Sequence, residues 1–366
     1  MRILILANYA NGIWLYRKEL VRSFIDDGHE VFISVPPDEN CQKLTKLGFN
    51  VIETELDRHG MNPVKDLGLL KNYLELIKKY RPGVVLTYTI KPNIYGATAA
   101  RLKRVPYICN ITGLGKAIQG GGMLSKVLCQ MYKFSMGKAV KVFFQNEGNM
   151  KILQERGIAK KNAALLPGSG VNTTEHPLRE YPDENEGIRI LAVLRMMRDK
   201  GVGEYLEAAE KLSTKLPNLK FELVGEYEED ERQIYEPMIQ GLVDKGILKY
   251  YGHIDNVEEV MSKSHIICHP SYHEGMSNVL LEAAACGRPI LTSNIPGCKE
   301  AVIEGKSGYL FKSESAPALI ESIEKIAALS AQERKDMGLE GRKFIVGKFD
   351  RNIIIDRYRQ ELAKLG

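Results

Sequence analysis

Residues 265–290 read His-Ile-Ile-Cys-His-Pro-Ser-Tyr-His-Glu-Gly-Met-Ser-Asn-Val-Leu-Leu-Glu-Ala-Ala-Ala-Cys-Gly-Arg-Pro-Ile. The apolar run that ends at a proline predicts a buried strand over 265–269. A polar turn follows, and the Ala/Leu-rich stretch predicts a helix from Asn278 to Cys286 that stops at Gly287. A strand, a polar turn and a helix in this order are typical of a phosphate-binding unit in an α/β domain.

Two carboxylates lie on either side of the expected helix start. Glu274 is in the turn, and Glu282 lies about 1.5 helical turns beyond a start near Ser277, so they can contact different parts of one extended ligand. The backbone N–H groups of Met276, Ser277 and Asn278 are expected to be unpaired, because the first N–H groups of a helix have no partner within it. The stretch therefore predicts a nucleotide pocket.

Outward from this stretch, predicted strands alternate with predicted helices, and several strands are apolar on both faces. This pattern indicates parallel sheets covered by helices, and it occurs in two blocks. We predict a Rossmann-like domain over 1–167 and a second one over 188–349, with 167–187 as a linker because it has no sustained apolar period. The helix at 350–366 is expected to pack back on the first domain, and the domains to face each other across a cleft.

The chain of 366 residues is divided by charge. Residues 1–166 hold 25 basic and 13 acidic residues, the remainder holds 26 and 33, and the segment between Glu75 and Glu147 has twelve basic residues and no acidic one. A positive face on the first domain suits an anionic partner: a bilayer surface, a lipid diphosphate or nucleic acid. A basic, solvated surface without a partner is the alternative.

Composition also bounds the location and the chemistry. No apolar run approaches the roughly 18 residues of a membrane span, and the N-terminal run is too short for a signal peptide. The six cysteines form no Cys-x-x-Cys pair, which favours reduced thiols and a cytoplasmic location. The histidines have no matching carboxylate cluster, and there is no Asp-x-Asp, so we expect neither a metal nor a cofactor.

Arg195 and Lys200 follow the first strand of the second domain and flank a turn. Two cations at the end of a strand can hold a diphosphate and neutralise the charge that develops when it leaves. Exposed arginine and lysine residues are common, so the pair gains weight only together with the Glu274 stretch.

Four motifs occur in order: Leu-Arg-x4-Lys-Gly, Phe-Glu-Leu-Val-Gly-Glu, Tyr-Gly-His-Ile and Glu-Gly-x6-Glu-Ala-x-Ala-Cys-Gly-Arg-Pro-Ile. In this series the chain resembles the family-four retaining glycosyltransferases, which have the two-domain GT-B fold. The resemblance implies same-face attack in which the leaving diphosphate accepts the proton of the acceptor. It implies that Arg195, Lys200 and Glu274 are catalytic, with Glu274 contacting the donor sugar, and that Glu282 binds the ribose. It also implies that the backbone of Met276, Ser277 and Asn278 binds the phosphate. The loop of Gly252, His253 and Ile254 is expected to lie beside the base.

Within that family the chain is similar to bacterial members that extend undecaprenyl-diphosphate-linked sugars in the assembly of glycans or glycoproteins. The pieces that carry this likeness are Tyr-Arg-Lys-Glu-Leu at 16–20, Val-Pro-Pro-Asp-Glu at 35–39 and Ile-Thr-Gly-Leu-Gly at 111–115. The likeness implies transfer of an N-acetylhexosamine from a UDP-sugar to a polyprenyl-diphosphate-linked saccharide.

The acceptor side departs from the family pattern. Many members have a Gly-Gly loop after the first strand and a histidine facing the donor sugar, where this chain has Asn-Tyr-Ala-Asn-Gly at 8–12 and Asn-Ile-Thr-Gly at 110–113. We predict Asn11, Arg17, Thr112 and Gly113 as acceptor-binding residues, with Arg17 reaching a phosphate or carboxylate. The alternative for each is an ordinary loop or surface residue.

Apolar and basic residues are interleaved over 116–141. On an exposed helix they would bind the headgroup layer, placing the protein at the inner face of the plasma membrane. The alternative is that the apolar stripe is the core face of an ordinary helix.

Two other functions stay open: a UDP-sugar 2-epimerase with the same fold, and a non-catalytic protein that binds nucleic acid or lipid.

Overall fold

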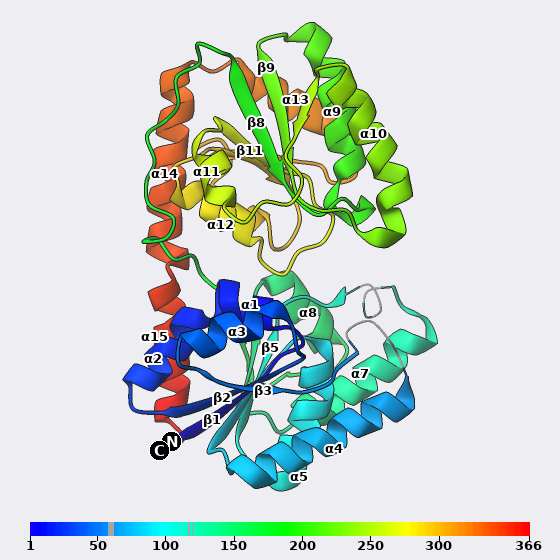
Figure 1. Ribbon diagram of the computed structural model, residues 1–366, viewed down its shortest axis with the longest axis vertical. Helices are drawn as coiled ribbons and strands as arrows, with labels where there is room; N and C mark the ends of the chain where they lie inside the picture. The colour runs from blue at the N-terminus through cyan, green and yellow to red at the C-terminus, as the bar shows by residue number, and fades with distance from the viewer. Residues whose placement is uncertain (58–61, 116–117, 119) are drawn as a thin grey trace. The chain divides into compact units, whose positions relative to one another are not determined.

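The computed structural model describes residues 1–57, 62–115, 118 and 120–366, in two compact units (Figure 1). One unit is Met1–Ser169 together with Arg351–Gly366, and the other is Gly170–Asp350. Each contains a parallel sheet covered by helices on both faces, so both are Rossmann-like, as the sequence predicted.

The first unit has a seven-stranded sheet in the order β3-β2-β1-β4-β5-β6-β7. The order reverses direction between β1 and β4, and ligands of such sheets bind at the carboxyl ends of the strands beside this reversal. The strands are β1 (Arg2–Leu6), β2 (Glu30–Val35), β3 (Asn50–Glu53), β4 (Val84–Tyr88), β5 (Tyr107–Ile111), β6 (Lys141–Phe144) and β7 (Ala163–Leu165).

Alternate side chains of β1 point into two cores. Ile3 and Ile5 face one group of helices, and Leu4 and Leu6 face the other. The first group is α1 (Ala10–Tyr16), α2 (Lys18–Asp26), α3 (Glu39–Lys46) and the C-terminal α15 (Arg351–Ala363), which packs on this unit as predicted. The second group is α4 (Pro63–Tyr80), the π-helix η1 (Pro92–Gly96), α5 (Ala97–Lys103), α7 (Gly122–Met136) and α8 (Glu147–Glu155).

The helical spacing of Leu15, Leu20 and Phe24 indicates one helix over 13–27, but the structure has two helices there. The backbone leaves the helical region at Arg17, which has φ −137° and ψ −5°, and α2 starts at the next residue. Apolar residues continue on the same side through the break, so their spacing does not reveal it. The side chain of Arg17 is 6% exposed.

The second unit has a six-stranded sheet in the order β10-β9-β8-β11-β12-β13, which reverses between β8 and β11. Its strands are β8 (Ile188–Val193), β9 (Leu219–Val224), β10 (Leu248–Tyr250), β11 (Ile266–His269), β12 (Ile290–Ser293) and β13 (Gly308–Phe311). One face is covered by α9 (Val202–Lys215), α10 (Arg232–Asp244) and α13 (Ala316–Ala327), and the other by α11 (Val257–Ser262), α12 (Asn278–Ala285) and α14 (Ala331–Phe349).

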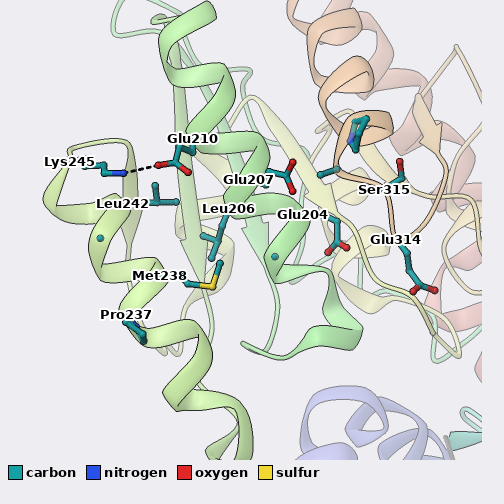
Figure 2. Close-up of a pocket in the computed structure, with 14 residues that line it drawn as sticks. Glu204, Leu206, Glu207, Glu210, Pro237, Met238, Leu242, Lys245, Glu314 and Ser315 are labelled. Carbon is teal, nitrogen blue, oxygen red and sulfur yellow. Dashed lines mark hydrogen bonds and ion pairs between the residues drawn. The ribbon is translucent and has the colours of Figure 1, made fainter.

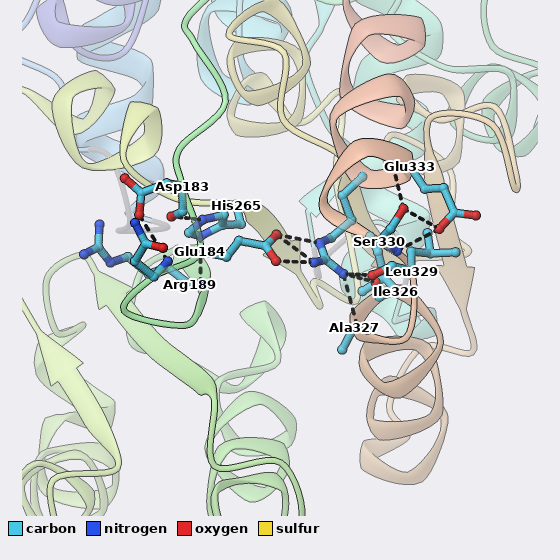
Figure 3. Close-up of polar contacts among 11 residues, drawn as sticks. Asp183, Glu184, Arg189, His265, Ile326, Ala327, Leu329, Ser330 and Glu333 are labelled. Atoms are coloured by element: carbon cyan, nitrogen blue, oxygen red, sulfur yellow. Dashed lines mark hydrogen bonds and ion pairs between the residues drawn. The ribbon is translucent and has the colours of Figure 1, made fainter.

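Residues 170–187, predicted to be a linker, belong to the second unit. Figure 3 shows the polar contacts of Asp183 and Glu184 in this segment. Both carboxylate oxygens of Glu184 accept hydrogen bonds from Arg334 at 2.6 Å, and Arg334 is 2% exposed. The main-chain oxygen of Asp183 lies 2.9 Å from Nε2 of His265, whose Nδ1 accepts the N–H of Arg189 at 2.9 Å. Ionic and polar contacts hold this segment in place, and the spacing of apolar residues in the sequence does not reveal such contacts.

Candidate active site

Lys200 and Glu274 form an ion pair at the reversal point of the second sheet. Lys200 ends η2 (Arg198–Lys200), the short 3-10 turn after β8, and Glu274 lies in the loop after the neighbouring β11. The lysine Nζ is 2.6 Å from Oε1 of Glu274, and the two side chains are 18% and 15% exposed. The structure thus brings together two of the predicted catalytic residues, at the place where such sheets bind ligands.

His269, which the sequence placed only at the end of a strand, also contacts Glu274. Its Nε2 lies 2.9 Å from the same carboxylate oxygen and 3.2 Å from Oγ of Ser277. The ring is 3% exposed, and its main-chain oxygen accepts a hydrogen bond from Thr292 at 2.8 Å. His269 therefore orients Glu274. A lone histidine at a strand end gave no signal for this role.

The pKa of Glu274 is set by opposing effects. Burial raises it, but the charge of Lys200 and the hydrogen bond with His269 outweigh burial and hold the pKa at about 2. Glu274 is therefore ionised at physiological pH. It can accept hydrogen bonds from ligand hydroxyl or amide groups, and it does not serve as a proton donor there.

Two glycines allow the loops of this site to approach one another. A Cβ on Gly201, at φ +71°, would lie 2.2 Å from the main-chain oxygen of Pro270. The Tyr272 N–H donates to the Asp199 oxygen at 2.8 Å in the same region. On the other side, a Cβ on Gly297 would lie 2.7 Å from the oxygen of Gly275. Larger residues here would displace Lys200 or Glu274.

The helix α12 begins with open donors, as predicted for Asn278, but one of the three predicted N–H groups is paired. Ser277 donates its N–H to the oxygen of Gly297 at 2.9 Å, so the prediction that this group is unpaired was wrong. No side chain caps the helix, since Oγ of Ser277 contacts His269. Within the described residues the N–H groups of Asn278, Val279 and Leu280 have no acceptor. The N–H groups of Asn278 and the next two residues are therefore available to an anion.

The remaining predicted donor residues lie at the same edge of this sheet. Arg195 follows β8, is 54% exposed and pairs with Glu228. Glu282 lies on α12 and is partly exposed. Gly252 follows β10, and its oxygen accepts the N–H of Gly225 at 2.9 Å. Next to it, the side chain of His253 is 67% exposed, and Ile254 packs against the apolar cluster that contains Met276.

The four predicted acceptor residues lie at the carboxyl edge of the first sheet. Asn11 and Arg17 follow β1, and Thr112 and Gly113 follow β5. These strands flank β4, so all four residues follow strands near the reversal point of that sheet. Asn110, in the segment where the resemblance led us to look for a histidine, is 3% exposed and donates to the oxygen of Thr87 at 3.0 Å.

A surface pocket of about 790 Å³ lies between α9, α10 and the turn before α13 (Figure 2). Four glutamates line it: Glu204, Glu207, Glu210 and Glu314. Lys245 is the basic residue of its lining, and it is paired with Glu210 at 2.7 Å. Such an acidic lining repels a diphosphate, so we do not assign the donor to this pocket.

No group of three or more His, Cys, Asp or Glu side chains in the described residues is arranged to hold a metal ion. Among the helices of the described ranges, none has both the length and the apolar character needed to cross a membrane.

Comparison with known proteins places the chain in a family. Residues 2–146 match the model of "Glycosyl transferase 4-like" proteins and residues 178–344 that of "Glycosyl transferases group 1". The chain is 30% identical over 380 residues to the N,N'-diacetylbacillosaminyl-diphospho-undecaprenol alpha-1,3-N-acetylgalactosaminyltransferase of Campylobacter jejuni, covering 98% of this chain and 97% of the relative. The chain belongs to the group 1 glycosyltransferases.

This glycosyltransferase is also 26% identical to the capsular polysaccharide biosynthesis glycosyltransferase CapM of Staphylococcus aureus, over 79% of this chain and 78% of CapM. Among solved structures it resembles Anabaena HepE in complex with UDP, with a TM-score of 0.83, 16% identity and 100% of both chains covered. It also resembles sucrose-phosphate synthase of Thermosynechococcus elongatus, with a TM-score of 0.80 and 19% identity, over 100% of this chain and 99% of the synthase. These likenesses show that the fold is GT-B.

Proposed function

We propose that this glycosyltransferase transfers an N-acetylhexosamine from a UDP-sugar to a hydroxyl of a polyprenyl-diphosphate-linked saccharide, with retention of configuration. The observation that carries the proposal is the Lys200 and Glu274 ion pair, 2.6 Å long, in the unit where α12 has an uncapped start. A cation and open N–H groups suit a diphosphate, and an ionised carboxylate suits sugar hydroxyls. The name of the Campylobacter relative supports the acceptor class, and the UDP in HepE supports the donor class.

The proposal assigns one part of the donor to each group of residues. Lys200 and Arg195 hold the diphosphate, together with the open N–H groups at the start of α12. Glu274 accepts hydrogen bonds from the donor sugar, and Glu282 accepts them from the ribose. The loop over 252–254 borders the base.

In the proposed reaction the acceptor oxygen attacks the anomeric carbon from the side on which the diphosphate leaves. The bond between that carbon and the phosphate oxygen breaks, the new glycosidic bond forms, and an oxygen of the leaving diphosphate takes the acceptor proton. Lys200 stabilises the negative charge that grows on the diphosphate. No side chain has to act as a nucleophile, in keeping with a Glu274 whose pKa of about 2 keeps it ionised.

The helix α7 supports association with an anionic membrane surface. Met123, Val127 and Phe134 are 76%, 49% and 48% exposed and, at helical spacing, form one stripe beside Lys126 and Lys133. Tyr132 and Met136, on another side of the helix, are buried in the core. Both faces that the sequence left as alternatives thus exist on this helix; residues 116, 117 and 119 lie outside the described residues. An apolar stripe flanked by lysines fits a headgroup layer and a lipid-linked acceptor.

The direct test is to incubate the protein with radiolabelled UDP-N-acetylhexosamines and a polyprenyl-diphosphate-linked saccharide. We expect label in the lipid fraction, and retention at the new linkage by NMR. Glu282→Gln should weaken UDP binding roughly tenfold to 100-fold, since it loses hydrogen bonds to a charged group. Absence of transfer with every UDP-sugar would reject the proposed function, and a new epimer formed without acceptor would indicate the 2-epimerase.

A further inference from the structure

Among the residues that the structure describes, one buried arginine has neither a carboxylate partner nor several main-chain acceptors. Among the described residues, the buried arginines are Arg17, Arg288, Arg334 and Arg351, with exposed fractions of 6%, 0%, 2% and 7%. Burying a guanidinium costs several kcal/mol unless a carboxylate or a set of carbonyls replaces the lost water. The groups around each arginine therefore show whether the protein itself compensates the cost of burying that charge.

Three of them are compensated within the chain. Arg334 pairs with Glu184 through two bonds of 2.6 Å, and Arg351 pairs with Glu19 at 2.6 Å. Arg288 has no carboxylate, but it donates to four main-chain oxygens, those of Arg179, Glu180, Ser262 and Gly287. Each of these arginines serves a structural purpose.

Arg17 differs from all three. In the described part of the chain its guanidinium donates from Nη1 to the oxygen of the preceding Tyr16, at 2.9 Å, and it lies beside Tyr88. It has no carboxylate partner there. Its Nε is buried without an acceptor, as are those of Arg288 and Arg351, but those two arginines bond a carboxylate or several main-chain oxygens through their other nitrogens. The guanidinium carbon lies 4.9 Å from the centre of the Tyr88 ring, a cation–π contact that compensates only part of the desolvation.

The position of Arg17 is that of a ligand site. It follows β1, and Tyr88 ends β4, so the two residues meet where the order of the first sheet reverses. The neighbouring polar groups are neutral and bonded to each other: Tyr88 contacts the hydroxyl of Tyr358 at 3.0 Å, and that hydroxyl contacts Oδ1 of Asn110 at 2.5 Å. They supply no negative charge to Arg17.

We propose that Arg17 binds an oxyanion of the acceptor. A guanidinium presents a planar fork of donors that matches phosphate and carboxylate oxygens, and an anion there would supply the missing charge. That the anion belongs to the acceptor rests on the proposed function. The same chemistry has two sources, the diphosphate of a lipid-linked saccharide and a carboxylate on its sugar, and the kinetic experiment below separates them.

The first experiment compares Arg17→Met with the matched variant Arg351→Met by thermal unfolding without ligand. Arg351→Met leaves Glu19 unpaired in a partly buried place and should lower the Tm by on the order of 10 °C. Arg17→Met removes a charge that no carboxylate balances, so its Tm should equal or exceed that of the wild type. An equally large fall for Arg17→Met would assign Arg17 a structural role and overturn the proposal.

The second experiment titrates inorganic pyrophosphate by calorimetry in the presence of saturating UDP, which blocks the donor site. Wild-type protein should bind pyrophosphate, and Arg17→Met should bind it roughly tenfold to 100-fold more weakly, the loss expected for hydrogen bonds to a charged group. Equal binding by both proteins would reject the oxyanion site. This result does not depend on transferase activity, so it is independent of the proposed function.

Kinetics then identify the source of the anion. If it is the diphosphate, Arg17→Met raises the acceptor KM for a diphosphate-linked saccharide and leaves it unchanged for the same saccharide on a neutral alkyl chain. If it is a sugar carboxylate, the defect persists on a neutral chain that carries a uronic acid. An unchanged KM with every acceptor would overturn the proposal.

Discussion

The two units have sheets of the same strand order around their reversal points, yet their carboxyl edges are built differently. In the second unit the cation Lys200 is paired with Glu274, and His269 contacts the same carboxylate. In the first unit the cation Arg17 is more deeply buried and has no carboxylate among the described residues. One edge carries its own counter-charge, and the other does not.

This difference indicates how each edge is expected to meet its ligand. At the second edge the diphosphate of a donor competes with Glu274 for Lys200, so the site is stable when empty and can exchange one anion for another. At the first edge the empty state has a cost, because a buried charge is incompletely solvated, and a bound anion removes that cost. The first edge is therefore expected to show a larger gain in stability when its anion binds.

The largest effect is expected at the paired edge. Lys200→Ala removes the cation that stabilises the leaving diphosphate, and kcat should fall roughly 100- to 1000-fold. Lys211→Ala, which removes an exposed lysine of α9 paired with Glu207, is the control and should keep the wild-type kcat. Steady-state assays with labelled UDP-sugar measure both. Full activity of Lys200→Ala would remove the mechanism.

A second prediction concerns acid stability of the same edge. The pKa of Glu274 in the folded protein is about 2, below the ordinary 4.5, so ionised Glu274 stabilises the fold above pH 4.5 and this stability is lost as the pH falls toward 2. The linked loss is about 3 kcal/mol. Urea unfolding from pH 7 to pH 2.5 should show a flatter pH dependence for Glu274→Gln. Identical slopes for the variant and the wild type would contradict the assignment.

The smallest effect is expected in the neutral network beside Arg17. Tyr358→Phe removes the hydroxyl that bonds to Tyr88 and Asn110, and the free energy of unfolding should fall by about 1–3 kcal/mol. Tyr132→Phe is the matched control, because the Tyr132 hydroxyl is buried with no hydrogen-bond partner among the described residues, so its loss should not destabilise the protein. Urea unfolding at neutral pH measures both. Equal losses would show that this network is not specifically stabilising.

Much of the fold could be predicted from the sequence, because strands apolar on both faces and regularly spaced helices are strong local signals. The start of α12 and its end before Gly287 were predicted from an Ala/Leu run and a glycine. The break at Arg17 could not be predicted, because the spacing of apolar residues does not reveal it. The docking of 170–187 could not be predicted either, since it depends on Glu184 and its distant partner Arg334.

The same limit applies to the candidate site. Lys200 and Glu274 could be singled out by motif, and the structure places them 2.6 Å apart. The contact of His269 with Glu274 and the bond from Ser277 to Gly297 join residues whose proximity is set by sheet order and loop packing. No spacing within one segment encodes such contacts, and so the sequence predicted an open N–H group at Ser277 that is bonded to Gly297 in the structure.

The measurement that tests the contrast most directly is a kinetic comparison of Lys200→Ala and Arg17→Met on one diphosphate-linked acceptor. We predict that Lys200→Ala lowers kcat and leaves the acceptor KM unchanged, whereas Arg17→Met raises the acceptor KM and leaves kcat unchanged. If both variants changed the same parameter to the same extent, the two edges would not have separate tasks, and the account would be contradicted.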